Sequence, residues 1–151
     1  TQLGLADTVM GTIAYMNKAL PTDFIISKNL YVAGNITSTA GAGIGYGTGS
    51  GGTVTQLTNK TTTVTLNKPC GQITMHNASL AAWEEVSFSV SNSLISGVES
   101  IICEAFNNAN YSVRTHYVIS GSFNIAVTNK TGSPLSEALQ INFAIIKGST
   151  N

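Results

Sequence analysis

The chain has 151 residues, seven basic and seven acidic side chains, no formal net charge and 42% hydrophobic residues. This length fits one domain with some residues to spare, and the hydrophobic content argues against a disordered protein. A chain without net charge has no field to attract nucleic acid, and apolar runs such as 144–146 are too short to span a bilayer, so we expect neither a nucleic-acid nor a membrane partner.

Charged residues make up only 9% of the chain, and Thr, Ser and Asn take their place. Their short polar side chains compete for backbone hydrogen bonds, which disfavours helices, and branched Thr favours strands. A surface of uncharged polar groups is also a weak barrier to self-association. The composition therefore favours a β-protein that works as an oligomer.

Residues 1–40 are predicted to form an N-terminal arm. Its apolar residues would line one face of a helix that ends before Pro21, although Gly4 and Gly11 weaken this interpretation. The alternative is an extended arm, in which the strand-like stretch 24–32 adds to the sheet of another subunit. We expect the extended arm, with Leu30, Tyr31, Val32 and Ile36 among its contacts.

Residues 41–52 (GAGIGYGTGSGG) are predicted to form a flexible hinge, because Gly stands at nearly every second position. The tract formally contains GxGxxG. A dinucleotide site needs this motif between a strand and a helix, whereas here it leads into a strand-like segment. We therefore expect no cofactor.

Residues 53–151 are predicted to form a β-domain. Short runs of alternating apolar and polar residues follow one another every 8–12 residues, separated by turn residues such as Lys68-Pro69 and Ser120-Gly121. About eight strands in two sheets predict an all-β, antiparallel β-sandwich resembling a jelly roll. The apolar members of these runs begin with Val64/Leu66, Ile73/Met75 and Val86/Phe88/Val90, and continue with Ile101/Cys103/Ala105, Tyr111/Val113/Tyr117/Ile119, Phe123/Ile125/Val127 and Leu139/Ile141/Phe143/Ile145.

No pattern of catalytic or metal-binding residues stands out. The two Asp residues lie in the arm, and Glu84 and Glu85 would point to opposite faces of a strand. His76 and His116 are isolated, and Cys70 and Cys103 are read as reduced, small hydrophobic residues. We therefore expect a protein that is not an enzyme and holds no metal.

Trp83 is read as the first residue of a strand. A ring at such a position packs at a sheet edge or a subunit contact, or stacks on a sugar. We take a subunit or capsid contact as the expectation.

The segments Gly45–Thr63, Val64–Met75 (VTLNKPCGQITM) and Phe143–Gly148 (FAIIKG) resemble segments of small bacteriophage virion proteins. With the spacing of the strands between them, the resemblance covers roughly residues 44–148. Residues 29–37 (NLYVAGNIT) are similar to short β-repeats of phage fibre shafts. Proteins of this kind are head decoration, head-fibre or tail-fibre components and are commonly trimeric.

The resemblance implies a structural protein of the virion, made in the cytoplasm of the host bacterium, with no signal peptide visible. We expect a capsid decoration (cement) protein that binds the major capsid protein on the outer head surface as a homotrimer. The short chain, which has no long shaft, favours this reading. The alternative is a receptor-binding module of a tail fibre or tailspike that contacts a host glycan or receptor through Trp83 or the loop 107–110.

Overall fold

The computed structural model describes residues 35–36 and 43–149 of a chain that divides into two units, 1–43 and 44–151. In its described part, the second unit holds eight strands and no helix. The all-β prediction is confirmed, and each predicted run corresponds to one strand. The strands are β1 (Gly51–Thr55), β2 (Val64–Thr65), β3 (Cys70–Thr74), β4 (Glu85–Ser91), β5 (Ser100–Ala105), β6 (Tyr111–Ile119), β7 (Ser122–Asn129) and β8 (Gln140–Ile146).

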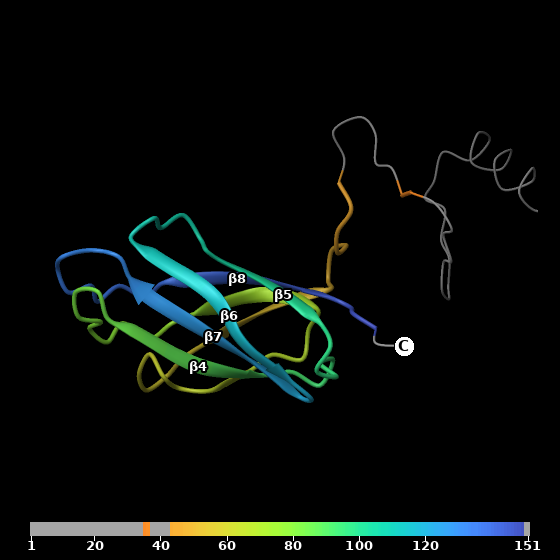
Figure 1. Ribbon diagram of the computed structural model, residues 1–151, viewed down its shortest axis with the longest axis horizontal. Coiled ribbons are helices and arrows are strands. Elements are labelled where there is room, and N and C mark those ends of the chain that lie inside the picture. The colour runs from red at the N-terminus through yellow and green to blue at the C-terminus, as the bar shows by residue number, and fades with distance from the viewer. Residues whose placement is uncertain (1–34, 37–42, 150–151) are drawn as a thin grey trace, which may run out of the picture. The chain divides into compact units, whose positions relative to one another are not determined.

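The strands form two four-stranded sheets that face each other as a sandwich. The first sheet has the order β1-β3-β8-β5 and the second the order β2-β4-β7-β6. Figure 1 shows β4, β7 and β6 as one layer in front of β8 and β5. The predicted β-sandwich of about eight strands is therefore confirmed.

Both sheets are mixed rather than purely antiparallel, which corrects one detail of the prediction. The edge strand β1 pairs with β3 in parallel, and β2 pairs in the same way with β4. The chain alternates between the sheets from β1 to β6, so β1 reaches β3 only by way of β2 in the opposite sheet. Two crossings bring the strand back in its original direction, and a parallel pair needs such a crossover.

The core lies between the sheets and contains the inward members of the alternating runs. Phe123 on β7 and Phe143 on β8 meet across it, with their ring centroids 5.3 Å apart and an interplanar angle of 54°. Ile73, Ile125 and Ile141 are completely buried around them. Burial of these apolar side chains is the main force that holds the sheets together.

Buried amides connect the loops to this core. The Asn129 side chain is fully buried, and its Nδ2 donates hydrogen bonds to the carbonyls of Leu80, Ala81 and Ser133 at 3.2, 2.9 and 2.8 Å. Its Oδ1 accepts from the Thr131 backbone N–H at 2.8 Å. Buried amides are retained only where their groups are satisfied, so Asn129 fixes the loops at one end of the sandwich.

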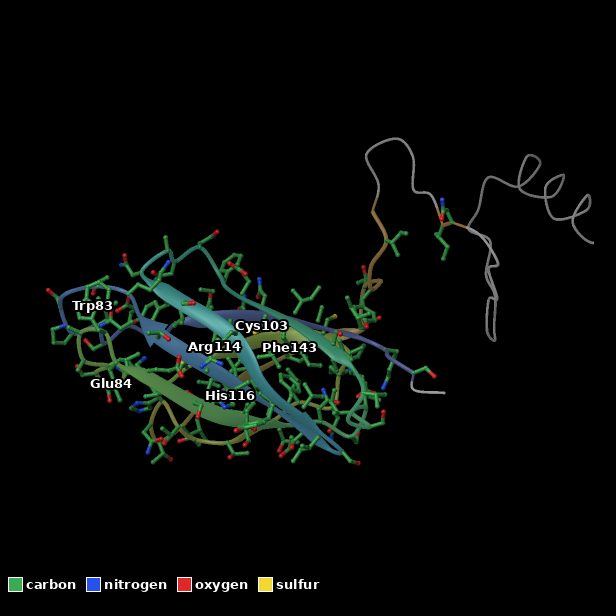
Figure 2. All side chains as sticks on the ribbon, in the orientation of Figure 1. Trp83, Glu84, Cys103, Arg114, His116 and Phe143 are labelled. Carbon is green, nitrogen blue, oxygen red and sulfur yellow. The ribbon has the colours of Figure 1, made fainter. Side chains whose placement is uncertain are left out.

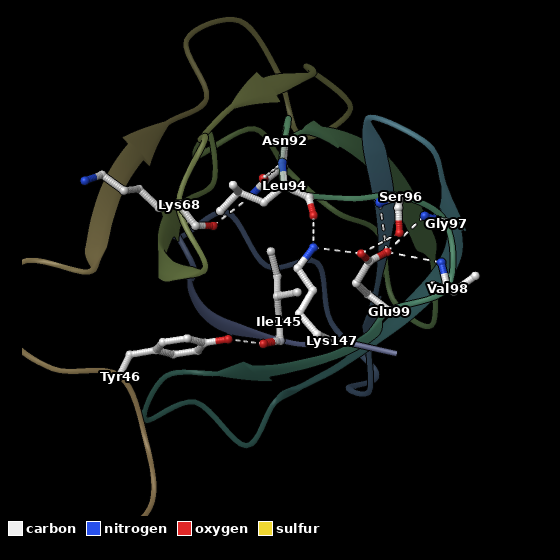
Figure 3. A network of polar contacts seen from close by, with 10 residues as sticks. All are labelled: Tyr46, Lys68, Asn92, Leu94, Ser96, Gly97, Val98, Glu99, Ile145 and Lys147. Carbon is white, nitrogen blue, oxygen red and sulfur yellow. Dashed lines mark hydrogen bonds and ion pairs between the residues drawn. The ribbon is translucent and has the colours of Figure 1, made fainter. Parts of the chain in front are cut away.

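At the other end of the sandwich, the buried carboxylate of Glu99 connects the loop before β5 to the segment after β8 (Figure 3). Glu99 accepts hydrogen bonds from the backbone N–H groups of Ser96, Gly97 and Val98 at 2.9–3.1 Å, and its Oε1 lies 2.8 Å from Lys147 Nζ. The Lys147 ammonium also donates to the carbonyl of Leu94. The ion pair with Lys147, supported by the N–H groups, holds the pKa of Glu99 far below its usual range.

Strand β6 contains a β-bulge that changes which side chains face the core. Thr115 pairs with Ile125, but the next pair is Tyr117 with Asn124, so His116 is the extra residue. Tyr111 and Val113, before the bulge, face the core, whereas Tyr117 and Ile119 are exposed. The sequence pattern placed all four on one face. That prediction is wrong because one extra residue reverses the alternation.

Candidate functional site

The histidines and acidic residues of the second unit lie in separate places. His76 Nδ1 accepts a hydrogen bond from the Ala78 backbone N–H at 3.0 Å, whereas His116 lies beside Arg114 on β6. Glu84 caps a turn through the Ala81 N–H, at 2.7 Å. Within residues 35–36 and 43–149, no three His, Cys, Asp or Glu side chains are placed to hold a metal ion. No helix in this part of the chain is long and apolar enough to cross a membrane.

The nucleophilic side chains of this unit include two free thiols and the buried amine of Lys60. Cys103 is buried, and burial raises the pKa of its thiol, while Cys70 is half-buried and both thiols are free. A thiol reacts as its thiolate, so a raised pKa makes Cys103 less reactive. Lys60 is buried with its ammonium on the carbonyls of His76 and Glu137, and burial lowers its pKa. These contacts give Lys60 a bracing role between loops, which the sequence pattern did not predict.

Trp83 lies in a turn before β4, not in the strand as predicted, because β4 begins at Glu85. Its φ is 62°, in the left-handed region that bulky residues rarely adopt, and its side chain is 68% exposed. The Glu84 N–H donates to the Ala81 carbonyl at 3.2 Å and closes this turn. Figure 2 shows Trp83 at the loop end of the sandwich, well away from His116. The turn thus presents a large ring to the outside.

Of the other predicted contact residues, Leu30, Tyr31 and Val32 lie outside the described residues. Ile36 is exposed. Their role in arm contacts stays a prediction, as does the interpretation of residues 41–52 as a hinge. The strand β1 begins at Gly51, inside that tract.

An exposed apolar surface lies on the outer face of the first sheet, around a groove that we call the end groove. Its volume is about 560 Å³, and the Tyr46 hydroxyl donates to the Ile145 carbonyl across it. Ile102 on β5 and Ile146 on β8 are 57% and 53% exposed and lie diagonally across the strand pair. The end groove is lined by Ile44, Gly45, Tyr46, Ile102, Ala144, Ile145, Ile146 and Lys147.

The same sheet face carries a polar row next to the end groove. Going along the strands, the cross-strand row Cys70, Ala144 and Ile102 gives way to the row Gln72, Asn142 and Glu104. Gln72 donates to Asn142 at 2.9 Å in this second row. The exposed residues Ile102 and Ile146 lie at the end of the sheet where residues 44–46 enter the domain, and Phe106, which follows β5, is 44% exposed at the other end.

An exposed apolar surface of this kind is typical of a contact surface, because a side chain such as Ile102 gains free energy only when a partner removes it from water. Sequence reasoning found the apolar period of β5 and β8 but not this surface. The sequence does contain a sign of this surface. Ile102 and Ile146 are apolar at positions where the alternation predicts an outward, polar side chain.

No protein-family model, curated protein or solved structure was found to match this chain.

Proposed function

We propose that this chain is a structural protein of a bacteriophage particle, a decoration protein that binds the outer surface of the head as a homotrimer and stabilises the shell. The observation that carries the proposal is the end groove, where exposed apolar side chains gather on the outer face of the first sheet. The resemblance of residues 44–148 to small phage virion proteins supplies the phage context.

A decoration protein works by adding contacts, not by chemistry. Standard protein interfaces bury about 1,600 Å² in total, and contacts repeated over a shell add up against the outward pressure of packaged DNA. The end groove would supply the apolar part of one such contact, with the major capsid protein or a neighbouring subunit as partner. A trimer closes by heterologous contacts, in which two different patches of the subunit meet.

A charge placed in the end groove tests this proposal. Ile102→Glu is expected to weaken binding to heads that lack the protein at least tenfold, because the contact would bury an unpaired carboxylate. Purified protein would be added to such heads, and bound protein would be measured after sedimentation, together with the temperature at which the heads release DNA. Since Ile102 is exposed in the single chain, the change should alter the free energy of unfolding by no more than about 0.5 kcal/mol.

Glu104→Gln is the matched control, because Glu104 faces outward on the same strand but lies in the polar row. It is expected to bind as the wild type does. Full binding and full protection of the heads by Ile102→Glu would show that the end groove is not the contact surface.

The second candidate function, a receptor-binding module of a tail fibre or tailspike, is favoured by a different observation. The exposed Trp83 ring stands in a left-handed turn at the loop end of the sandwich. Strained residues cluster at binding sites, and a large exposed ring is a common anchor for a partner. In that case Trp83, and not the end groove, would carry the contact.

A further inference from the structure

The outer face of the second sheet carries an ordered group of polar and aromatic side chains that the head-binding proposal does not use. The pairing of the strands places Tyr117 on β6, Asn124 on β7 and Ser89 on β4 in one row across this face. The next row along the strands contains Arg114, Ala126 and Ser87. The two inner strands therefore present small side chains, and β6 presents large ones along one side.

Glu85 and Arg114 form an ion pair on this face, which we call the brace. Arg114 Nη2 lies 2.9 Å from Glu85 Oε1, and the Thr128 hydroxyl donates to the other carboxylate oxygen at 2.8 Å. To reach β4 from β6, the Arg114 side chain crosses β7, and Ala126 in its row is 0% exposed although it faces outward. Both charges are thus compensated within the brace.

The bulge in β6 places the His116 ring beside Tyr117 on this face. Consecutive residues of a regular strand point to opposite faces, but the extra residue allows His116 and Tyr117 to lie side by side, with ring centroids 4.2 Å apart. His116 Nδ1 is 3.2 Å from Arg114 Nη1, so the brace also holds the imidazole. The two rings meet at an interplanar angle of 64°, and Tyr117 is still 61% exposed. Bulges are common beside binding sites because they re-aim a side chain in this way.

Beside the exposed ring lie hydrogen-bonding groups with unused capacity. The Ser89 hydroxyl donates to Asn124 Oδ1 at 2.9 Å, which orients the amide. Asn124 Nδ2 has no hydrogen-bond partner within the described part of the chain, and each Glu85 oxygen can accept a further bond. The Tyr117 ring and the Asn124 amide donor therefore lie in one row, and Glu85 lies two rows further along the strands, opposite Thr128.

This combination matches one class of ligand. A pyranose ring has an apolar C–H face that stacks on an aromatic ring and a rim of hydroxyls that both donate and accept. An anionic ligand would have to displace Glu85 from Arg114, whereas a neutral sugar leaves the brace intact. We propose that the outer face of the second sheet binds a neutral hexopyranose unit of a glycan, with Tyr117 as the stacking ring and Asn124 as a hydrogen-bonding partner. This binding does not depend on the head-binding function.

The test is an NMR titration of the full chain with D-glucose, D-galactose, D-mannose and N-acetyl-D-glucosamine, each to about 50 mM, which detects millimolar dissociation constants. At least one sugar is expected to shift the backbone amides of Ser89, Tyr117 and Asn124. Tyr117→Ala should weaken that binding about tenfold through loss of the stacking ring, while Tyr117→Phe should retain it. Because Tyr117→Phe keeps the ring, it separates loss of stacking from damage to the strand.

Trp83→Ala is the control for a site in the loops, and it should bind the same sugar as the wild type does. Three results would overturn the proposal. One is the absence of any shift with all four sugars. Another is a set of shifts around Trp83 that Trp83→Ala removes. The third is a change in the Tyr117 region with protein concentration but not with sugar, which would identify this face as a contact between copies of the chain.

Discussion

Phe123→Ala is expected to lower the free energy of unfolding by about 3–5 kcal/mol, the range found when a buried aromatic side chain is removed from a core. Phe123 is 0% exposed and packs against Phe143 of the opposite sheet, so its loss leaves a cavity between the layers. Whole domains are stable by only about 5–15 kcal/mol, so this single change removes a large part of the total. Urea unfolding followed by far-ultraviolet circular dichroism measures the difference.

Ser122→Ala is the control for Phe123→Ala. Ser122 precedes Phe123 on β7, and its side chain points to the outer face of the sheet. It should change the free energy of unfolding by no more than about 0.5 kcal/mol. A loss below about 1 kcal/mol for Phe123→Ala would mean that the two sheets do not pack through this ring.

Glu99→Gln is expected to lower the unfolding midpoint at pH 7 more than any exposed carboxylate-to-amide substitution. The amide cannot form the ion pair with Lys147, and its NH₂ group replaces an oxygen that accepts either from Lys147 or from the N–H groups of Ser96 to Val98. Because the pKa of Glu99 is depressed in the folded chain, its stabilising effect is fully present above the pKa of an unfolded Glu, about 4.3. The effect is lost as the pH falls through the folded pKa.

Thermal unfolding of the two proteins between pH 7 and pH 2 therefore tests the role of Glu99. The difference between wild type and Glu99→Gln should be constant above about pH 5 and shrink below about pH 4. Glu104→Gln, an exposed position on β5, should follow the wild type throughout. A difference that stays constant down to pH 2 would contradict a role for the Glu99 charge.

The strands of this fold were predictable because each run alternates with a period of two. Val86, Phe88 and Val90 on β4 show how directly the alternation corresponds to side chains that face the core. The pairing of these strands was not predictable. The alternation indicates which face of the sheet a side chain occupies, but it does not indicate which strand lies next to it. The parallel edge pairs β1–β3 and β2–β4 depend on crossings between the sheets that leave no local mark in the sequence.

The candidate surfaces were predictable only in part, because each depends on a local exception to the pattern. The bulge at His116 turns Tyr117 outward, and one extra residue cannot be recognised in a run of alternating apolar and polar positions. The contact role of Trp83 stays a prediction, and the left-handed turn that exposes its ring was not predicted. For Glu99 a usable signal existed, since Ser96-x-x-Glu99 has the spacing of a capping box, in which a carboxylate accepts from the backbone three residues earlier.

Immunogold electron microscopy of intact phage particles, with an antibody raised against residues 53–151, tests the proposed function most directly. A decoration protein predicts label spread evenly over the head. Label confined to the tail end would contradict this function and would favour the receptor-binding module with Trp83 at its contact surface.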